Sequence, residues 1–360
     1  MRTADDIEQV KTDRVAPQIP DGLRATHKRR QKDEWRATAR KIDALRQSLA
    51  EQQRAVLSPK LRERIVNAAK GEAREDMRGP GLRYQSLLAA RNAKVDLPTL
   101  KGLRSRAHAE FRDIVKIDGG FRTHETVIGS GFDVLKQPPI FYAPPDPGKE
   151  KLFYPPFHGS WDRFEQSQAS GDGTIVDSRS YLDGTGCLGS KLVARNHDAS
   201  DVDLLCAYRE SGYLVQFKTL RTGILQVKVD LQALFCRHHI STRDEWGWSD
   251  FHATTQGRLV LAVFWNWEDV DPASEVSHQW FVSGLDCAGD GESFPGTSFQ
   301  AVPGERRIIN MFTDMAFPAG RKLWVYVGLS DRIWAFLNDV SIDISIDSAW
   351  LLNSLAIRSI

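Results

Sequence analysis

The 360-residue sequence lacks several features that would identify its chemistry at once. Its four cysteines, Cys187, Cys206, Cys236 and Cys287, form no C-x-x-C pair, so a zinc site or a redox pair has no support. Their spacing leaves two disulfides open but favours separate buried thiols in a reducing compartment. No apolar run reaches the ~18 residues of a membrane helix, and the first residues lack the apolar segment of a secretory signal. We therefore expect a cytoplasmic protein without a membrane span.

The common catalytic motifs are also missing. The sequence contains no G-x-S-x-G and no H-E-x-x-H, since His124-Glu125 is followed by Thr-Val-Ile. We therefore predict no catalytic residue, no cofactor and no metal-ligand set. A pair of carboxylates working on a sugar stays open as an alternative, because acidic residues are plentiful and sequence spacing does not show which of them face each other.

One glycine-rich segment imitates a nucleotide site. Residues 183–191 read DGTGCLGSK and contain G-x-G-x-x-G, but Lys191 is one position too late for a phosphate loop. A dinucleotide fingerprint needs a helix whose first amides receive the phosphates. Residues 192–195 leave room for only about one turn before a polar, turn-rich run. We therefore interpret the glycines as a turn and a strand end, and expect no nucleotide.

Charge is distributed unevenly, although the net charge is only +1. Residues 1–118 hold 27 of the 48 basic and 17 of the 47 acidic residues, which leaves 21 basic and 30 acidic residues for 119–360. Residues 1–30 are polar and contain the basic run HKRR, so we expect a flexible basic arm there. The unequal charge of residues 1–118 and 119–360 indicates that the two halves have different surroundings, or that they attract each other in an assembly. Interspersed acids and few aromatics in the first half argue against nucleic-acid binding.

Residues 31–118 carry helical patterns. One narrow apolar stripe repeats every seven residues, at Trp35, Ile42, Leu49 and Val56. Ser58-Pro59 predicts the start of a second helix. Pro98 opens a later helix with one apolar face, formed by Leu100, Leu103, Ala107, Phe111, Ile114 and Val115. Such narrow stripes need a partner, which is either the rest of the chain or a second copy.

Residues 119–160 form a connector rich in proline and aromatic residues. Seven of the 16 prolines lie between Pro138 and Pro156. Because proline fixes φ and lacks an N–H donor, we expect neither a helix nor a central strand here. The composition predicts an extended course along the surface of the following domain, or a docking motif for a protein partner.

Residues 161–360 show the period of two that is typical of half-buried strands. The segment 212–231, with a turn at 221–223, predicts a β-hairpin. Residues 340–347 alternate four apolar with four polar residues without exception. No long helical pattern interrupts these strands. The predicted fold class is therefore segregated α+β, with an N-terminal helical region followed by an antiparallel all-β sandwich of the jelly-roll kind.

Two residue pairs are candidates for ligand binding. Trp246 and Trp248 are two residues apart in a polar context, so in a strand both indoles face one side. Exposed, they would form a stacking platform for a ligand; buried, they would fill the core. His238 and His239 are adjacent, so in a regular strand they point to opposite faces and do not share one ion. We expect one imidazole inside the domain and the other toward solvent.

Together these patterns predict a non-enzymatic structural or binding protein. A helical module at 31–118 would mediate assembly or anchoring, and a β-sandwich at 161–360 would bind a protein partner or build a larger particle. The alternatives are a lectin-like carbohydrate-binding protein and a carbohydrate-active hydrolase on a β-sandwich. Self-association or a protein partner is expected through the helical module and the connector, with a glycan as a further ligand.

Overall fold

The computed structural model describes residues 21–72, 80–116, 124–128, 150–169, 174–197, 202–244, 250–265, 274–289, 294–301, 303–338 and 340–360. Within these residues four helices come first: α1 (Asp21–Val56), α2 (Pro59–Glu72), α3 (Pro80–Asn92) and α4 (Leu97–Val115). The described strands follow and form two sheets.

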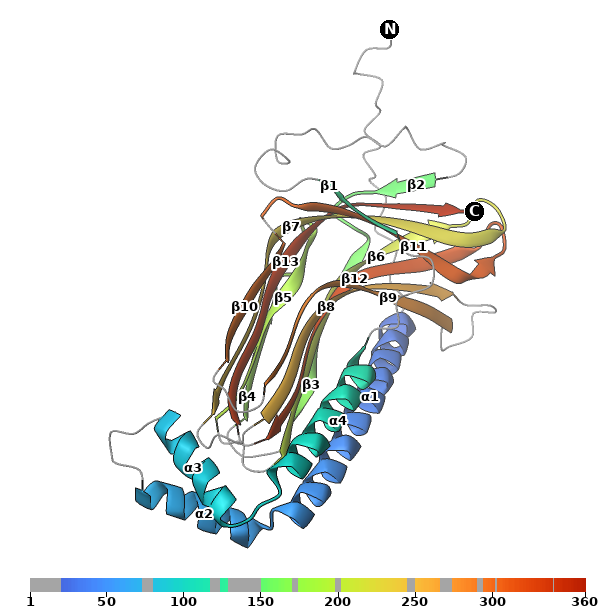
Figure 1. The fold of residues 1–360 in the computed structure, drawn as a ribbon. Helices are drawn as coiled ribbons and strands as arrows, with labels where there is room; N and C mark the ends of the chain where they lie inside the picture. The colour runs from blue at the N-terminus through green and yellow to red at the C-terminus, as the bar shows by residue number, and fades with distance from the viewer. Residues whose placement is uncertain are drawn as a thin grey trace.

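The two sheets are antiparallel and face each other (Figure 1). The larger one has eight described strands, in the order β1 (His124–Ile128), β11 (Arg306–Phe317), β7 (Gly223–Asp244), β13 (Val340–Ser359), β5 (Cys187–Asn196) and β4 (Thr174–Ser180), with β10 (Phe294–Ala301) beside β7 and β2 (Glu150–Phe153) beside β13. The smaller one has five, in the order β3 (Gly159–Ala169), β6 (Val202–Lys218), β12 (Lys322–Asn338), β8 (Asp250–Trp265) and β9 (Ser274–Gly289). This arrangement confirms the predicted α+β fold with a β-sandwich.

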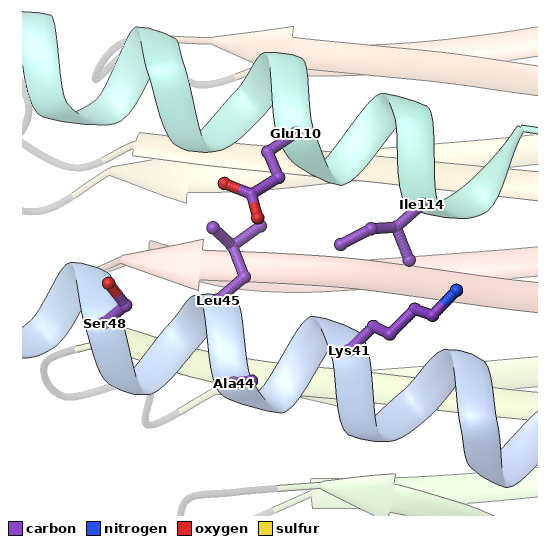
Figure 2. Close-up of a pocket in the computed structure, with 6 residues that line it drawn as sticks. All are labelled: Lys41, Ala44, Leu45, Ser48, Glu110 and Ile114. Atoms are coloured by element: carbon purple, nitrogen blue, oxygen red, sulfur yellow. The ribbon is translucent and has the colours of Figure 1, made fainter.

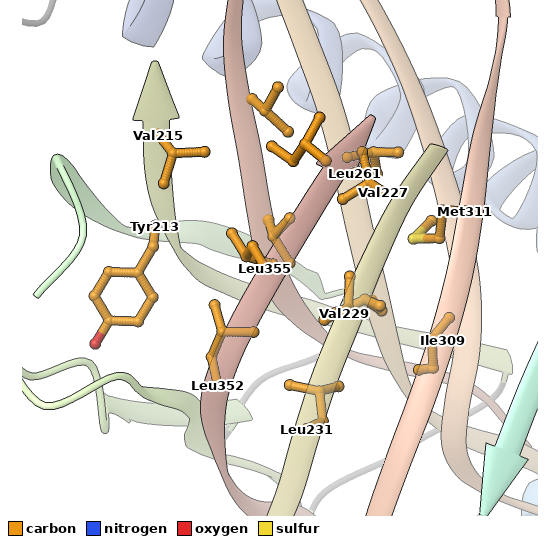
Figure 3. Close-up of a cluster of buried hydrophobic side chains, with 14 of the residues drawn as sticks. Tyr213, Val215, Val227, Val229, Leu231, Leu261, Ile309, Met311, Leu352 and Leu355 are labelled. Carbon is orange, nitrogen blue, oxygen red and sulfur yellow. The ribbon is translucent and has the colours of Figure 1, made fainter. Parts of the chain in front are cut away.

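Apolar side chains that alternate along the strands fill the space between the sheets. Figure 3 shows part of this core, in which side chains of β7, β11 and β13 meet those of β6 and β8, among them Tyr213, Val215, Val227, Val229, Leu261, Met311 and Leu352. At the start of β13, Ile342, Ile344 and Ile346 are at most 1% exposed, as the alternation predicted. Each such burial contributes about 1.5–3 kcal/mol.

Helices α1 and α4 lie side by side along the outer face of the smaller sheet (Figure 1). Trp35 and Ile42 of α1 and Phe111 of α4 are buried against Tyr208 and Trp334 of that sheet. The narrow stripe of α1 is therefore covered by the sandwich of its own chain. In the described part of the chain no helix lies on the outer face of the larger sheet.

Helices α2 and α3 form a hairpin at the end of α1, away from the sheets (Figure 1). Its own small cluster centres on two buried side chains, Ile65 and Ala90. Tyr84 of α3 is 65% exposed. Two helices of 14 and 13 residues are marginal without further packing. The hairpin is therefore the part of the described helical module with the least support from the rest of the chain.

The predicted hairpin at 212–231 is wrong, although both of its strands exist. β6 lies in the smaller sheet between β3 and β12, and β7 lies in the larger sheet beside β13 and β11. The chain crosses from one sheet to the other at 219–222. The physical reason is that both edges of each strand pair with partners distant in sequence, so the turn residues join the two layers rather than two neighbours.

The structure also differs from the prediction in the bounds of the N-terminal arm and of the connector. The basic arm was expected to reach residue 30, but α1 begins at Asp21, and His27 within it is 1% exposed. Leu23, His27 and Gln31 recur every four residues and are buried, which accounts for the early helix start. In the connector, the described residues 124–128 and 150–153 are the short strands β1 and β2, paired with β11 and β13. Most of the proline-rich stretch lies outside the described residues.

Candidate binding surface

The two predicted histidines point to opposite faces of β7, as the adjacent positions indicated. His238 is 0% exposed and lies inside the sandwich, whereas His239 lies partly exposed on the outer face of the larger sheet. Trp246 and Trp248, the predicted stacking pair, lie outside the described residues. The structure thus brings His239, but not His238, to a surface.

His238 belongs to a polar belt inside the sandwich, formed by Ser190, His238, Thr255, Ser283, Asp331 and Ser348. The imidazole of His238 lies 2.8 Å from the Thr255 hydroxyl and 3.0 Å from the Ser283 hydroxyl. Burial lowers the pKa of His238 to about 4, so the ring is neutral near pH 7.

Asp331 is the acidic member of the belt. Its carboxylate accepts hydrogen bonds from Ser190 Oγ at 2.6 Å and from Ser348 Oγ at 3.1 Å. Burial raises the pKa of Asp331 to about 7, although both hydroxyls favour the charged form. Along β12, Asp331 separates Leu329 of one apolar cluster from Ile333 of another. The belt is closed to solvent and joins the two sheets; it is not a surface for a ligand.

The glycine-rich segment forms a turn that leads into β5, not into a helix, as predicted. Asp183 accepts hydrogen bonds from the backbone N–H of Thr185 at 2.8 Å and of Cys187 at 3.1 Å. Gly189, with φ of 118°, lies within β5, where a Cβ would collide with the carbonyl oxygen of Ser348. The four cysteines, all in described strands, are buried and unpaired, as expected.

Sequence reasoning missed an ionic cluster beneath α1. His27 Nε2 lies 2.6 Å from Glu210 of β6, and His27 Nδ1 lies 3.0 Å from Glu275 of β9. Trp161 and Tyr326 stack beside the imidazole, with ring centroids 4.6 Å apart. Two carboxylates thus lie on either side of one imidazole, and a hydrolase also needs a pair of carboxylates. The His27 ring fills the space between them beneath the helix, however, so here they serve as its counter-ions.

A shallow groove runs between α1 and α4 (Figure 2). It encloses about 340 Å³ and is lined by Lys41, Ala44, Leu45, Ser48, Glu110 and Ile114. Glu110 and Ile114 of α4 point toward α1, where the Glu110 carboxylate lies beside Leu45 (Figure 2). The groove has few converging polar groups and offers little to orient a polar ligand.

The outer face of the larger sheet gathers a different set of side chains, which we term the outer patch. It consists of Asp177, Arg179 and Tyr181 at β4; Lys191, Val193 and Arg195 of β5; Asp343, Ser345 and Asp347 of β13; and Phe235, Arg237, His239, Ser241 and Arg243 of β7. In β5, β13 and β7 these residues alternate with inward-facing, buried ones, which places them on the outer face.

Tyr181 is the centre of the outer patch. Its hydroxyl donates a hydrogen bond to Asp347 at 2.6 Å and accepts one from Arg179 at 3.1 Å. Its ring packs edge-on against Phe235, with centroids 5.5 Å apart, and Phe235 is 39% exposed. Burial, followed by the bond to Asp347, raises the pKa of Tyr181 above 10, so the phenol keeps its proton. Sequence patterns did not point to Tyr181, because its partners lie on distant strands.

The outer patch itself is polar and partly ion-paired. Arg195 Nε lies 2.9 Å from Asp343 Oδ1, and the two side chains are 51% and 44% exposed. Exposed ion pairs of this kind contribute little to stability, about 0–1 kcal/mol. Their side chains can therefore exchange partners for a ligand at small cost.

Among the described residues no group of three His, Cys, Asp or Glu side chains is arranged to hold a metal ion. The same part of the chain contains no helix long and apolar enough to cross a membrane.

No protein-family model matches the sequence, and no curated protein matches it. Among solved structures, the enzymatically active domain of tailspike protein 4 of bacteriophage CBA120 aligns with 49% of this chain and 19% of its own, at 7% identity and a TM-score of 0.17. TmCBM61 in complex with β-1,4-galactotriose aligns over 50% of this chain and 88% of its own, at 11% identity and a TM-score of 0.13. A family 11 carbohydrate-binding module from Clostridium thermocellum aligns over 50% and 95%, at 11% identity and a TM-score of 0.15. Similarities this low support no argument about the chain.

Proposed function

We propose that this is a non-enzymatic binding protein whose β-sandwich holds a carbohydrate on the outer patch. Helices α1 and α4 cover the outer face of the smaller sheet, whereas no described helix lies on the outer face of the larger one. The function is the lectin-like alternative of the sequence analysis, placed on a surface that the sequence did not indicate.

The supporting observation is the Tyr181 cluster. A partly exposed aromatic pair, Tyr181 and Phe235, lies directly beside Asp347 and Arg179. Aromatic rings pack against the C–H faces of sugars, and carboxylate and guanidinium groups bond to sugar hydroxyls. Among the described side chains of the patch, apolar groups are few, so the surface suits a hydroxyl-rich ligand better than the apolar core of a protein interface.

Trp246 and Trp248 remain a second predicted stacking pair within this proposal. They follow β7, whose Arg243 belongs to the outer patch. If they bind the same ligand, the double variant Trp246→Ala/Trp248→Ala loses affinity together with Tyr181→Ala.

The test is calorimetric titration with a panel of neutral and acidic oligosaccharides. Tyr181→Ala is expected to weaken binding about tenfold, the loss of one well-placed aromatic contact. Tyr84→Ala is the matched control, because Tyr84 is an exposed tyrosine on the distant hairpin. Absence of binding across the panel, or equal loss in both variants, contradicts the proposal.

A second function, assembly through the helical module, is favoured by the α2–α3 hairpin. Among the described side chains, its cluster has two buried apolar residues, Ile65 and Ala90, with partly buried ones packed around them, while Tyr84 and Leu88 are 65% and 40% exposed. Contact with another copy would complete this packing. Light scattering at several salt concentrations is expected to show oligomers that Leu88→Glu dissociates, and a monomer at high protein concentration contradicts this function.

A further inference from the structure

The outer patch is basic, although it lies in the acidic part of the chain. Its described side chains include five Lys and Arg residues and three Asp residues, together with His239. Residues 119–360 as a whole carry 21 basic and 30 acidic residues. The outer patch is therefore basic although residues 119–360 as a whole carry more acidic than basic residues.

One row across four strands carries most of this charge. Arg179 of β4 pairs with Lys191 of β5, Lys191 with Asp347 of β13, and Asp347 with Arg237 of β7. Residues paired in this way share one face, so three basic side chains flank a single carboxylate. With strands about 4.8 Å apart, the row extends over about 15 Å, which is long enough for an extended chain ligand.

The next rows alternate in charge. Asp177, Ser345 and His239 lie in the second row, and Arg195 is paired with Asp343 in the third. A polyanion without hydroxyls would meet Asp177, Asp343 and Asp347 at close range and be repelled. A chain that carries hydroxyls beside each negative charge instead finds acceptors for its hydroxyls and guanidinium forks for its charged groups.

We propose that the ligand of the outer patch is a carboxylate-bearing polysaccharide, a chain of uronic acid residues, held by Arg179, Lys191 and Arg237 with a sugar ring against Tyr181 and Phe235. This inference rests on the proposed carbohydrate-binding function and names the class of sugar. Arginine matches a planar carboxylate with two parallel hydrogen bonds, which accounts for arginines at both ends of the row.

The test compares two probes, an oligogalacturonate and a neutral galactan oligomer of equal length, by calorimetry at low and high salt. The oligogalacturonate is expected to bind at least tenfold more tightly than the neutral oligomer at low salt. It should lose this advantage at high salt, because exposed charges are screened beyond a few ångströms in ~1 M salt.

The decisive variant is Arg179→Gln/Lys191→Gln, which removes two neighbouring charges of the row. The matched control is Lys218→Gln/Lys322→Gln, since these exposed lysines are also register partners, on β6 and β12 of the smaller sheet. We expect the first variant to weaken oligogalacturonate binding at least tenfold and the control to leave it unchanged, with circular dichroism confirming that both are folded.

The outcomes separate the two proposals. If the neutral oligomer binds as well as the acidic one, or if both variants behave alike, the uronic acid inference is wrong while carbohydrate binding stands. If neither oligosaccharide binds and the wider panel is also silent, the proposed function itself is wrong. Selective, salt-sensitive binding that is lost only in Arg179→Gln/Lys191→Gln supports both.

Discussion

His27 of α1 and Glu210 of β6 are 183 positions apart in the chain, yet Nε2 of the imidazole lies 2.6 Å from the glutamate carboxylate and both side chains are buried. Glu275 contacts the other ring nitrogen. Burial lowers the pKa of His27, but the two carboxylates outweigh it and raise the pKa from 6.5 to about 9. The charged ring therefore ties the first turns of α1 to the smaller sheet.

This contact predicts a pH-dependent stability. Because the folded pKa is raised, the stabilisation is complete below pH 6.5 and is lost as pH rises through about 9. The free energy of unfolding of the wild type is expected to fall by roughly 3 kcal/mol across this window. Urea unfolding should show that His27→Gln lacks the decline, whereas His197→Gln, at a 54% exposed histidine, keeps it. A decline that persists in His27→Gln would assign it to another group.

The buried carboxyl group of Asp331 predicts that the free energy of unfolding also depends on pH in a lower range. Its folded pKa of about 7 exceeds the ordinary value of 3.8, so stability is lost as pH rises from 3.8 through 7. Asp331→Asn keeps the shape and the bonds to Ser190 and Ser348 without the charge. We expect the variant to be more stable than the wild type above pH 7, by roughly 2–4 kcal/mol, and to differ little below pH 4. Thermal unfolding at both extremes measures this, and a variant that is less stable above pH 7 contradicts it.

The glycine-rich segment provides a matched pair of substitutions. A Cβ at Gly189 would collide with the carbonyl oxygen of Ser348, and the residue has a φ of 118°. A Cβ at Gly184 would meet no atom within 4 Å. Gly189→Ala is therefore expected to lower the free energy of unfolding by roughly 3 kcal/mol or more, and Gly184→Ala by less than about 1 kcal/mol. Equal effects in chemical denaturation would show that close strand packing is not the role of Gly189.

The α2–α3 hairpin is expected to open independently of the sandwich. Ile65→Ala removes one of the two buried side chains of its cluster. Hydrogen exchange should then speed up in α2 and α3 alone, because the rest of the chain has its own core. Ile42→Ala, at a fully buried position on α1, should instead lower global stability by about 2–5 kcal/mol. Global unfolding of Ile65→Ala would contradict the independence of the hairpin.

Local sequence patterns predict which segments form helices and strands, but not which strands pair with each other in a sheet. The face of α4 and the alternation at 340–347 appear in the structure as expected, since burial on one side imposes a period on the residues themselves. The pairing of β6 and β7 was mispredicted, because a turn between two strands has the same composition whether the strands pair or lie in opposite sheets.

The candidate site was largely beyond sequence reasoning for a related reason. Of the predicted site residues, His239 lies in the outer patch and His238 lies in the interior. Tyr181, Phe235 and Asp347 meet only because β4, β7 and β13 are brought together by the sheet. No spacing rule connects residues that far apart along the chain. The basic run around His27 likewise predicts an arm, because it hides the four-residue spacing of the buried residues Leu23, His27 and Gln31.

The most direct test of ligand binding on the outer patch is a hydrogen–deuterium exchange footprint with saturating oligogalacturonate. Protection is expected in β4, in β5, in the first half of β13 and in the second half of β7, with α1 and the smaller sheet unchanged. Protection confined to α1, to the groove beside α4 or to the smaller sheet would contradict it.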